Sequence, residues 1–377
     1  MKILILGGTG AMGRPLVKNL STTQPEADIH VTSRRRQPDQ DGTGRVRHLL
    51  GNARDNSFLN DILTNGGGRY DIIVDFMNYD LDEFAARMNT LLSSCSHYIW
   101  FSSARVYAES EEPLSETSPR LLETSTDTDF LATNRYALRK ARQENLLTGS
   151  GFSNYTIIRP YITYNNERLQ LGICEKEQWL YRLLKGRPLV LSRTMLDKTT
   201  TLTFGGDVAE AITDLIGNNS AKGRIFQIAG TDTITWRELL ELYCNIITVH
   251  TGFRPKVFAS DSIKDIEMLY EGGYNTIYDR NYNRTFNSAR INEAIGREID
   301  YTPIREGVTR CLTDFLSGDR KFLRIDPAYE AYQDLITDSY SDKTDFTSDD
   351  DWHIYLSKRD PQLTDISNPH PHLEQIL

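Results

Sequence analysis

The segment KILILGGTGAMG (2–13) decides the fold of the N-terminal half of the chain. Its first part, KILIL, is a short and largely apolar run that is typical of a buried strand. Next come Gly7, Gly10 and Gly13, and the pattern G-x-G-x-x-G is also satisfied through Gly8. A strand, a turn without side chains and a helix start allow backbone N–H groups and the helix dipole to face a pyrophosphate. We therefore predict a dinucleotide-binding turn; the alternative is a glycine-rich turn that only permits close packing.

Apolar runs rich in β-branched and aromatic residues recur after this turn and predict buried strands at 28–33, 70–76, 97–102 and 153–159. Helix-length segments lie between the strands, near 11–20, 55–64, 81–94 and 130–148. Strands and helices that alternate in this way predict an α/β fold of the Rossmann type, with a doubly wound parallel sheet. In such a fold Ala11 and Met12, which lie between two of the glycines, are placed at the cofactor.

The end of the second strand decides which dinucleotide is bound, because an acidic residue there would hold the ribose 2′-hydroxyl of NAD. The sequence instead reads Ser33-Arg34-Arg35-Arg36, without a carboxylate. Guanidinium groups bind phosphate in a bidentate manner, so the run favours NADP, with NAD as the alternative. The other interpretation is a solvated loop that carries a run of charges. Asn52, after the third strand, is a candidate for the adenine edge or an ordinary turn residue.

The remaining chain predicts a division into an NAD(P)-binding Rossmann domain (1–160), a smaller α/β substrate-binding lobe (161–317) and an acidic C-terminal extension (318–377). Some segments of the lobe are expected to return to the first domain. Within the lobe we expect helices near 174–185, 207–217, 235–249 and 287–295, and a strand at 224–229. Residues 109–128 read as a long surface loop. The acidic run 339–352 reads as a solvated segment, and a lid or interaction arm is the less common alternative.

Composition argues against several classes of protein. The chain has 377 residues and a net charge of −9, with a pI near 5.4, which opposes a broad nucleic-acid or anionic-membrane surface. The cysteines and histidines are scattered, so we expect reduced thiols and no metal site. No run approaches the ~18 apolar residues of a membrane span. No secretory signal precedes the first strand, and we therefore expect a cytoplasmic protein.

The segment TNRYALRKARQE (133–144) sets Tyr136 and Lys140 four residues apart, on one face of a helix. Such a pair also arises by chance on an ordinary amphipathic helix. A phenol with a pKa of about 10 is a poor base at neutral pH, but a neighbouring ammonium favours the phenolate and lowers that pKa. Ser102 and Ser103 end a central strand, where ligands meet such sheets. Beside a nicotinamide, a phenol and a hydroxyl would let an alcohol lose a proton while its carbon loses hydride.

These motifs resemble, in order, those of the extended short-chain dehydrogenases/reductases, which include the NAD(P)-dependent sugar epimerases and dehydratases. GGTGAMG resembles their glycine motif, YIWFSSARVY their serine strand, NRYALRK their Tyr-x-x-x-Lys helix, IIRPYITY the next strand and FGGDVAEAI a downstream Asp-Val-Ala segment. The resemblance covers about residues 1–315. It implies that Tyr136 is the acid/base, that Lys140 tunes it and contacts the nicotinamide ribose, and that Ser103 polarises the substrate oxygen.

The resemblance also implies that Ser102 is the alternative to Ser103, that Pro160 lies at the cofactor, and that the protein is a homodimer. One departure concerns the reaction. Family members that dehydrate sugars carry Thr-Asp-Glu where this chain has Ser103-Ala104-Arg105, so the carboxylates that would expel water are missing. A dehydratase is therefore not expected.

Other departures concern the substrate. Thr200 stands where many nucleotide-sugar enzymes of the family carry a diphosphate-binding arginine, and Arg187, Arg193 or Arg280 are the candidates to replace it. The common Tyr-Gly-Pro appears as Tyr164-Asn165-Asn166. Local contacts to the substrate therefore differ from those of the family.

We expect an NAD(P)-dependent oxidoreductase or epimerase that acts on a secondary alcohol or ketone of a sugar, which we expect to be nucleotide-activated. No nucleic acid or membrane partner is expected. The alternative is a non-catalytic dinucleotide-binding sensor or RNA-associated scaffold with the same fold.

Overall fold

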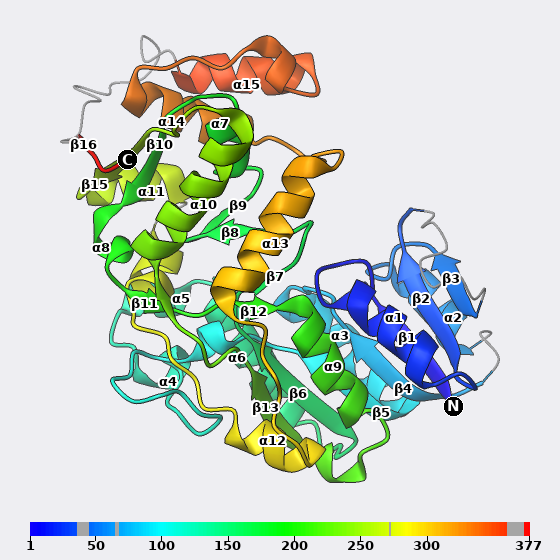
Figure 1. The fold of residues 1–377 in the computed structure, drawn as a ribbon. Coiled ribbons are helices and arrows are strands. Elements are labelled where there is room, and N and C mark those ends of the chain that lie inside the picture. Colours follow the sequence, from blue (N-terminus) through cyan, green and yellow to red (C-terminus); the bar gives the residue numbers. More distant parts are fainter. Residues whose placement is uncertain (36–44, 65–67, 271–272, 360–372) are drawn as a thin grey trace.

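The computed structural model of the chain describes residues 1–35, 45–64, 68–270, 273–359 and 373–377. Within these ranges, seven parallel strands form one large sheet in the spatial order β13-β6-β5-β4-β1-β2-β3 (Figure 1). The order turns back at β1, as it does in a doubly wound Rossmann sheet, and the predicted fold class is confirmed. The strands are β1 (Lys2–Leu6), β2 (Asp28–Ser33), β3 (Val46–Leu50), β4 (Tyr70–Asp75), β5 (Cys95–Phe101), β6 (Tyr155–Pro160) and β13 (Arg224–Ile228).

Helices cover both faces of this sheet, because successive side chains of each strand point to opposite sides. Along β1, Ile3 and Ile5 belong to a buried cluster with α1, α9 and α12, whereas Leu4 and Leu6 belong to a second cluster with α2, α3 and α6. The elements of this half are α1 (Gly13–Thr23), α2 (Asn56–Thr64), α3 (Leu81–Ser93), η1 (Ala104–Val106), α4 (Leu121–Thr124), α5 (Thr128–Ala132), α6 (Tyr136–Thr148), α9 (Gly205–Leu215), η2 (Asn219–Ala221) and α12 (Ala289–Ile295).

Two strands of the large sheet differ from what the sequence pattern predicts. β13 comes from the predicted substrate lobe, yet it pairs in parallel with β6 and extends the large sheet. β3 pairs with β2 at the opposite edge, and the search for apolar runs misses it. Its Arg47 and Leu50 are exposed and no β3 side chain is fully buried, because an edge strand does not need two apolar faces.

The single helix predicted over 130–148 is wrong, because the chain breaks into α5 and α6 (Figure 1). Asp127 caps α5 by accepting the N–H of Phe130 at 2.9 Å. The Arg142 guanidinium then donates to the carbonyl of Thr133 at 2.6 Å, and thereby satisfies backbone between the two helices. As a result Tyr136 is the first residue of α6 and not a residue in the middle of a longer helix.

A third and larger buried cluster forms the core of the lobe, which lies above the sheet (Figure 1). The helix predicted over 174–185 is wrong, since Glu175 lies in a short hairpin with Gln170 and only α7 is helical. The elements of the lobe are β7 (Thr163–Tyr164), β8 (Gln170–Leu171), β9 (Cys174–Glu175), α7 (Leu180–Leu184), β10 (Leu189–Ser192), α8 (Arg193–Leu196), β11 (Thr199–Thr200), β12 (Thr203–Phe204), β14 (Ile234–Thr235), α10 (Trp236–Thr251), β15 (Val257–Ser260), α11 (Ile263–Tyr270), η3 (Thr276–Arg280) and α13 (Ile304–Ser317).

The acidic C-terminal extension packs on this lobe rather than standing apart from it (Figure 1). It contains α14 (Pro327–Thr337), η4 (Lys343–Asp345), α15 (Asp349–Arg359) and β16 (Leu373–Gln375), and β16 adds an antiparallel edge to β15. Arg182 of α7 binds Glu330 at 2.7 Å and Asp334 at 2.8 Å, and all three side chains are fully buried. Acidic residues of α14 therefore belong to the core. No helix in the described ranges is long and apolar enough to cross a membrane.

Replacement of Arg182 by Met is expected to destabilise the protein by about 3–5 kcal/mol, because it removes one of the two guanidinium groups that balance the buried carboxylates of Glu330 and Asp334, and Arg187 alone remains. The matched control is Arg237→Met, which removes an exposed pair with Asp197 at 2.8 Å and should cost less than about 1 kcal/mol. Urea unfolding of both variants measures the difference. Equal losses in the two variants would mean that the α14 contact contributes nothing beyond a surface pair.

Candidate active site

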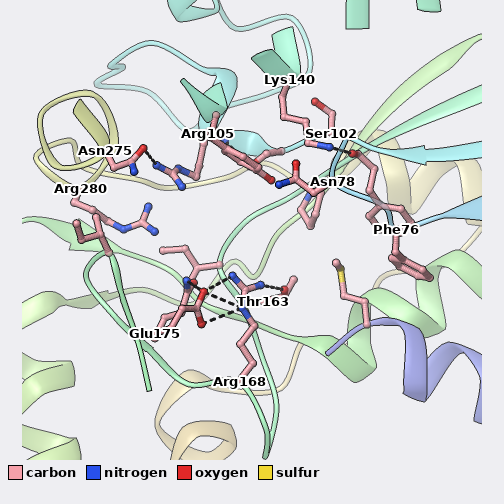
Figure 2. Close-up of a pocket in the computed structure, with 18 residues that line it drawn as sticks. Phe76, Asn78, Ser102, Arg105, Lys140, Thr163, Arg168, Glu175, Asn275 and Arg280 are labelled. Carbon is pink, nitrogen blue, oxygen red and sulfur yellow. Dashed lines mark hydrogen bonds and ion pairs between the residues drawn. The ribbon is translucent and has the colours of Figure 1, made fainter. Parts of the chain in front are cut away.

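A cavity of about 370 Å³ lies where the large sheet meets the lobe. Residues from the carboxyl ends of β5 and β6, from α6, and from the lobe line it (Figure 2). Ligands of doubly wound folds bind at this edge of the sheet. The lining residues are Met12, Phe76, Asn78, Phe101, Ser102, Ser103, Arg105, Tyr136, Lys140, Pro160, Ile162, Thr163, Arg168, Gln170, Ile173, Glu175, Asn275 and Arg280.

The glycine turn lies beside this cavity and is shaped by close backbone contacts. A Cβ atom on Gly8 would lie 2.8 Å from Val31, and one on Gly13 would lie 2.6 Å from the backbone of Gly8. Gly7 has a φ of +73°, which L side chains rarely adopt. Next to Gly10, by contrast, there is open space within 4 Å. The turn therefore fits a pyrophosphate at the start of α1.

A second cavity of about 390 Å³ extends from the glycine turn along the ends of β2, β3 and β4. Phe76 and Asn78 line both cavities, so the two form adjoining parts of one groove. Their combined position, from the glycine turn to α6, fits an extended dinucleotide. The residues of the second cavity are Gly7, Thr9, Thr32, Ser33, Arg34, Gly51, Asn52, Ala53, Arg54, Phe76, Met77 and Asn78.

The predicted cofactor-binding residues are distributed over this groove. Ser33, Arg34 and Asn52 line the second cavity, whereas Met12 and Pro160 line the first. Gly7 also lines the second cavity, and Tyr136 and Lys140 line the first. Four further residues of the glycine motif and the arginine run occupy other positions. Arg35 is exposed, and its carbonyl accepts a hydrogen bond from the Ser33 hydroxyl. Ala11 lines neither cavity but lies against Gly205 at the start of α9, and Gly13 packs on Gly8. Arg36 lies outside the described residues.

Tyr136 and Lys140 lie side by side in the first cavity, one turn apart on α6. The Lys140 Nζ atom is 5.9 Å from the centre of the Tyr136 ring. It donates a hydrogen bond of 2.8 Å to the carbonyl of Phe101 at the end of β5. Burial lowers the pKa of Lys140 to about 7, with an opposing influence of the Asp75 carboxylate. The ammonium is therefore close to its titration point, where small changes of environment alter its charge.

The two candidate serines have different partners. Ser103 is the N-cap of η1, and its hydroxyl accepts the N–H of Arg105 at 3.2 Å, which leaves the hydroxyl proton for another acceptor. The Ser102 hydroxyl instead donates to Glu144 at 2.5 Å. Both residues line the cavity. Ser103 is therefore the better placed of the two to donate to a substrate oxygen.

Glu144 forms the centre of a buried network beneath the site, which the sequence reasoning missed. Its carboxylate accepts from Arg159 of β6 at 2.8 and 2.6 Å and from Arg120 at 2.8 Å. Burial would raise the pKa of Glu144, but Arg159, Ser102 and Arg120 hold it below its usual value. Its spacing of four residues from Lys140 was the available signal, because it places both on one face of α6.

Charged residues of η1 and of the lobe form the far wall of the cavity (Figure 2). Arg105 donates to Asn275 at 2.5 Å, and Arg168 binds Glu175 at 2.8 Å. Of the three arginines that could replace the missing diphosphate contact, Arg280 lines the cavity. The other two do not: Arg187 lies in the buried cluster with Glu330 and Asp345, and Arg193 pairs with Asp261 at 2.8 Å on the surface.

The comparisons with known proteins agree with this geometry. Residues 3–229 match the model of the NAD dependent epimerase/dehydratase family. The chain belongs to this family. It is also 28% identical over 246 residues to the chloroplast stem-loop binding protein of 41 kDa b from Arabidopsis thaliana. That match covers 62% of this chain and 60% of the relative, so the chain spans about three fifths of the relative's length.

Solved structures of the epimerase/dehydratase family share the fold. A dTDP-glucose 4,6-dehydratase from Bacillus anthracis, in complex with NAD, superposes with a TM-score of 0.63 at 14% identity, over 85% of this chain and 98% of that one. The UDP-glucose 4-epimerase of Thermus thermophilus, in complex with NAD, gives a TM-score of 0.60 at 16% identity, over 85% and 100%. At these identities the likeness shows the fold alone.

A buried carboxylate next to the candidate active site is the other feature that the sequence reasoning missed. Asp75 ends β4, is fully buried, and accepts the Tyr98 hydroxyl at 2.7 Å and the Met77 N–H at 2.9 Å. Burial raises its pKa from 3.8 to about 6, although these hydrogen bonds and Lys140 oppose the shift. The strand reads as apolar around it, so nothing in the sequence distinguishes Asp75 from a polar residue at a strand end.

Because its pKa is higher in the folded state, Asp75 contributes stability below the unfolded value of 3.8 and loses it as the pH rises through 6. As the pH rises from roughly 3.5 to 7, the free energy of unfolding of Asp75→Asn should therefore increase by up to about 3 kcal/mol relative to that of the parent protein. Urea unfolding at several pH values tests this. The control is the exposed Glu241→Gln on α10, and an Asp75→Asn curve parallel to the parent curve would contradict the assignment.

Proposed function

We propose that the protein is an NAD(P)-dependent oxidoreductase or epimerase that acts on a secondary alcohol or ketone of a sugar, with nucleotide-activated sugars as the first candidates. Tyr136 is the acid/base, Lys140 stabilises its phenolate, and Ser103 polarises the substrate oxygen. The supporting observation is that these three side chains line one cavity, which adjoins the cavity at the glycine turn through Phe76 and Asn78.

The chemistry follows from the positions of these groups. A bound nicotinamide would accept or supply hydride. When the substrate is an alcohol, the Tyr136 phenolate takes the hydroxyl proton while the carbon loses hydride, and the reverse direction returns the proton to the ketone oxygen. The Lys140 ammonium, 5.9 Å from the ring centre, favours the phenolate. The Ser103 hydroxyl donates to the same substrate oxygen and limits the charge that develops there.

The residues around the three catalytic candidates restrict the reaction further. Elimination of water needs a carboxylate beside the reacting carbon, and Arg105 stands at that position, which disfavours a dehydratase. Reductase and epimerase begin with the same hydride step. They differ in whether the cofactor is exchanged at each turnover.

Replacement of Tyr136 by Phe should lower kcat of the nicotinamide-dependent reaction by about 10²–10⁴-fold, because it removes the proton that is transferred in the transition state. The change is followed by nicotinamide absorbance. The matched control is Tyr332→Phe, which removes a hydroxyl from α14 of the C-terminal extension and should leave kcat unchanged. Retention of full activity by Tyr136→Phe would rule out the assigned role.

We also propose that NADP is the preferred cofactor, with Arg34 at the 2′-phosphate. Arg34 lines the second cavity next to Ser33 and Asn52, and a hydrogen bond to a charged group contributes roughly 1.5–3 kcal/mol. Arg34→Ser should therefore weaken NADPH binding about 10–100-fold and leave NADH binding nearly unchanged. Calorimetry measures both, with the exposed Arg47→Ser of β3 as the control. Tighter binding of NADH than of NADPH by the parent protein would reverse the proposal.

A second candidate is a non-catalytic dinucleotide-binding sensor or RNA-associated scaffold. The name of the relative that is 28% identical, a stem-loop binding protein, favours it. The net charge of −9 opposes a broad RNA surface, and a scaffold does not require Ser103, Tyr136 and Lys140 in one cavity. Tight binding of an RNA hairpin at physiological salt, without nicotinamide-dependent turnover of any sugar, would favour the scaffold over the enzyme.

A further inference from the structure

Three arginines converge on one carboxylate behind the far wall of the candidate active site, and two of them, Arg105 and Arg280, line the cavity. The Asp279 side chain lies 3.3 Å from Arg105 Nε and 3.1 Å from Arg284 Nε, and it also pairs with Arg280. The side chains are 18%, 0% and 2% exposed for Arg105, Arg284 and Arg280, and Asp279 is 2% exposed. One negative charge therefore faces three buried or nearly buried positive charges.

The rest of the described cavity wall does not balance this excess. Among the described residues that line the cavity, only Glu175 carries a carboxylate. It is bound to Arg168 at 2.8 Å and also accepts from Gln170, so its charge is already matched by a guanidinium. Lys140 adds a further cationic group on the opposite wall. Uncompensated buried charge is costly, and an anionic ligand in the cavity would remove that cost.

The position of Arg105 shows which part of a substrate such an anion would occupy. Arg105 comes two residues after Ser103, and its guanidinium lies 5.1 Å from the centre of the Tyr136 ring. The group that Arg105 binds is therefore next to the carbon on which Tyr136 acts. Figure 2 shows Arg105, Asn275 and Arg280 together at one side of the cavity, away from Phe76 on the cofactor side.

We propose that the substrate carries a carboxylate or phosphate close to its reacting carbon, and that Arg105 binds this group with Arg280 behind it. The proposal rests on the proposed function, because it takes Tyr136 as the acid/base. It places the anion at the sugar end of the cavity. A guanidinium suits this role because its planar donors match the oxygens of both anions.

Calorimetry on the cofactor-saturated protein tests the proposal with two matched pairs of probes: UDP-glucuronate against UDP-glucose, and glucose 6-phosphate against glucose. We expect the charged member of one pair to bind at least about tenfold more tightly than its neutral partner, since one charge-assisted bidentate contact is worth that much. The pair that shows the preference distinguishes a carboxylate from a phosphate. Equal affinity within both pairs, or binding of none of the four, overturns the proposal.

Two variants connect the preference to this site. Arg105→Gln removes the guanidinium, and Asn275→Asp keeps it but places a carboxylate on its hydrogen-bond partner. Each should reduce the preference to less than about threefold, whereas the surface variant Arg237→Gln should retain it. Survival of the preference in both site variants contradicts the assignment. The second variant keeps the test valid if Arg105→Gln fails to fold.

A different role for Arg105 would give a different pattern. If the guanidinium only stabilised the Tyr136 phenolate, Arg105→Gln would shift the pH profile of turnover equally for neutral and charged sugars and leave the calorimetric preference intact, which overturns the proposal. Failure of the proposed function is separate, because it appears as unchanged turnover in Tyr136→Phe. The calorimetric preference does not depend on that turnover.

Discussion

The buried carboxylate of Glu144 holds the candidate active site together. It accepts hydrogen bonds from Ser102 at the end of β5, from Arg159 in β6 and from Arg120 in the loop before α4. A buried carboxylate is stable only when its oxygens are fully satisfied, so these partners cannot move independently of one another. Because Lys140 and Tyr136 lie one and two turns before Glu144 on α6, the network also fixes their distance from β5.

The same burial controls the charge of Lys140. Its Nζ atom lies 4.7 Å from the Trp100 ring and 2.8 Å from the Phe101 carbonyl, where little water can solvate an ammonium. Desolvation lowers its pKa, whereas the carboxylates of Asp75 and Glu144 oppose that effect. Because the resulting pKa is about 7, a phenolate or a ligand nearby can shift Lys140 between its neutral and its charged form. A lysine on the surface would stay charged and would respond to neither.

Local sequence patterns predict what depends on local structure. The strand, glycine turn and helix start at 2–13 predict the Rossmann sheet, since a buried parallel sheet needs continuous apolar strands. The pair Tyr136 and Lys140 follows from helical spacing. The break between α5 and α6 is not predictable, because it depends on Arg142 reaching back to the carbonyl of Thr133. Asp75 escapes prediction for the same reason, since its partners lie on other elements. The helical spacing of Glu144 from Lys140 is visible in the sequence, but its partners on other elements are not.

The position of Arg105 at the cavity is the feature with the largest consequence for function that the sequence did not predict. Read along the sequence, it only marks the absence of a dehydratase carboxylate. In the fold, Ser103 is the N-cap of η1, and this short helix therefore directs both the proposed catalytic hydroxyl and the residue two positions later toward the same cavity. A change at that second position alters the charge beside the reacting carbon but leaves Ser103, Tyr136 and Lys140 in place. Under the proposed function, one short turn thus holds the proposed hydride-transfer geometry constant while it selects the chemistry of the substrate.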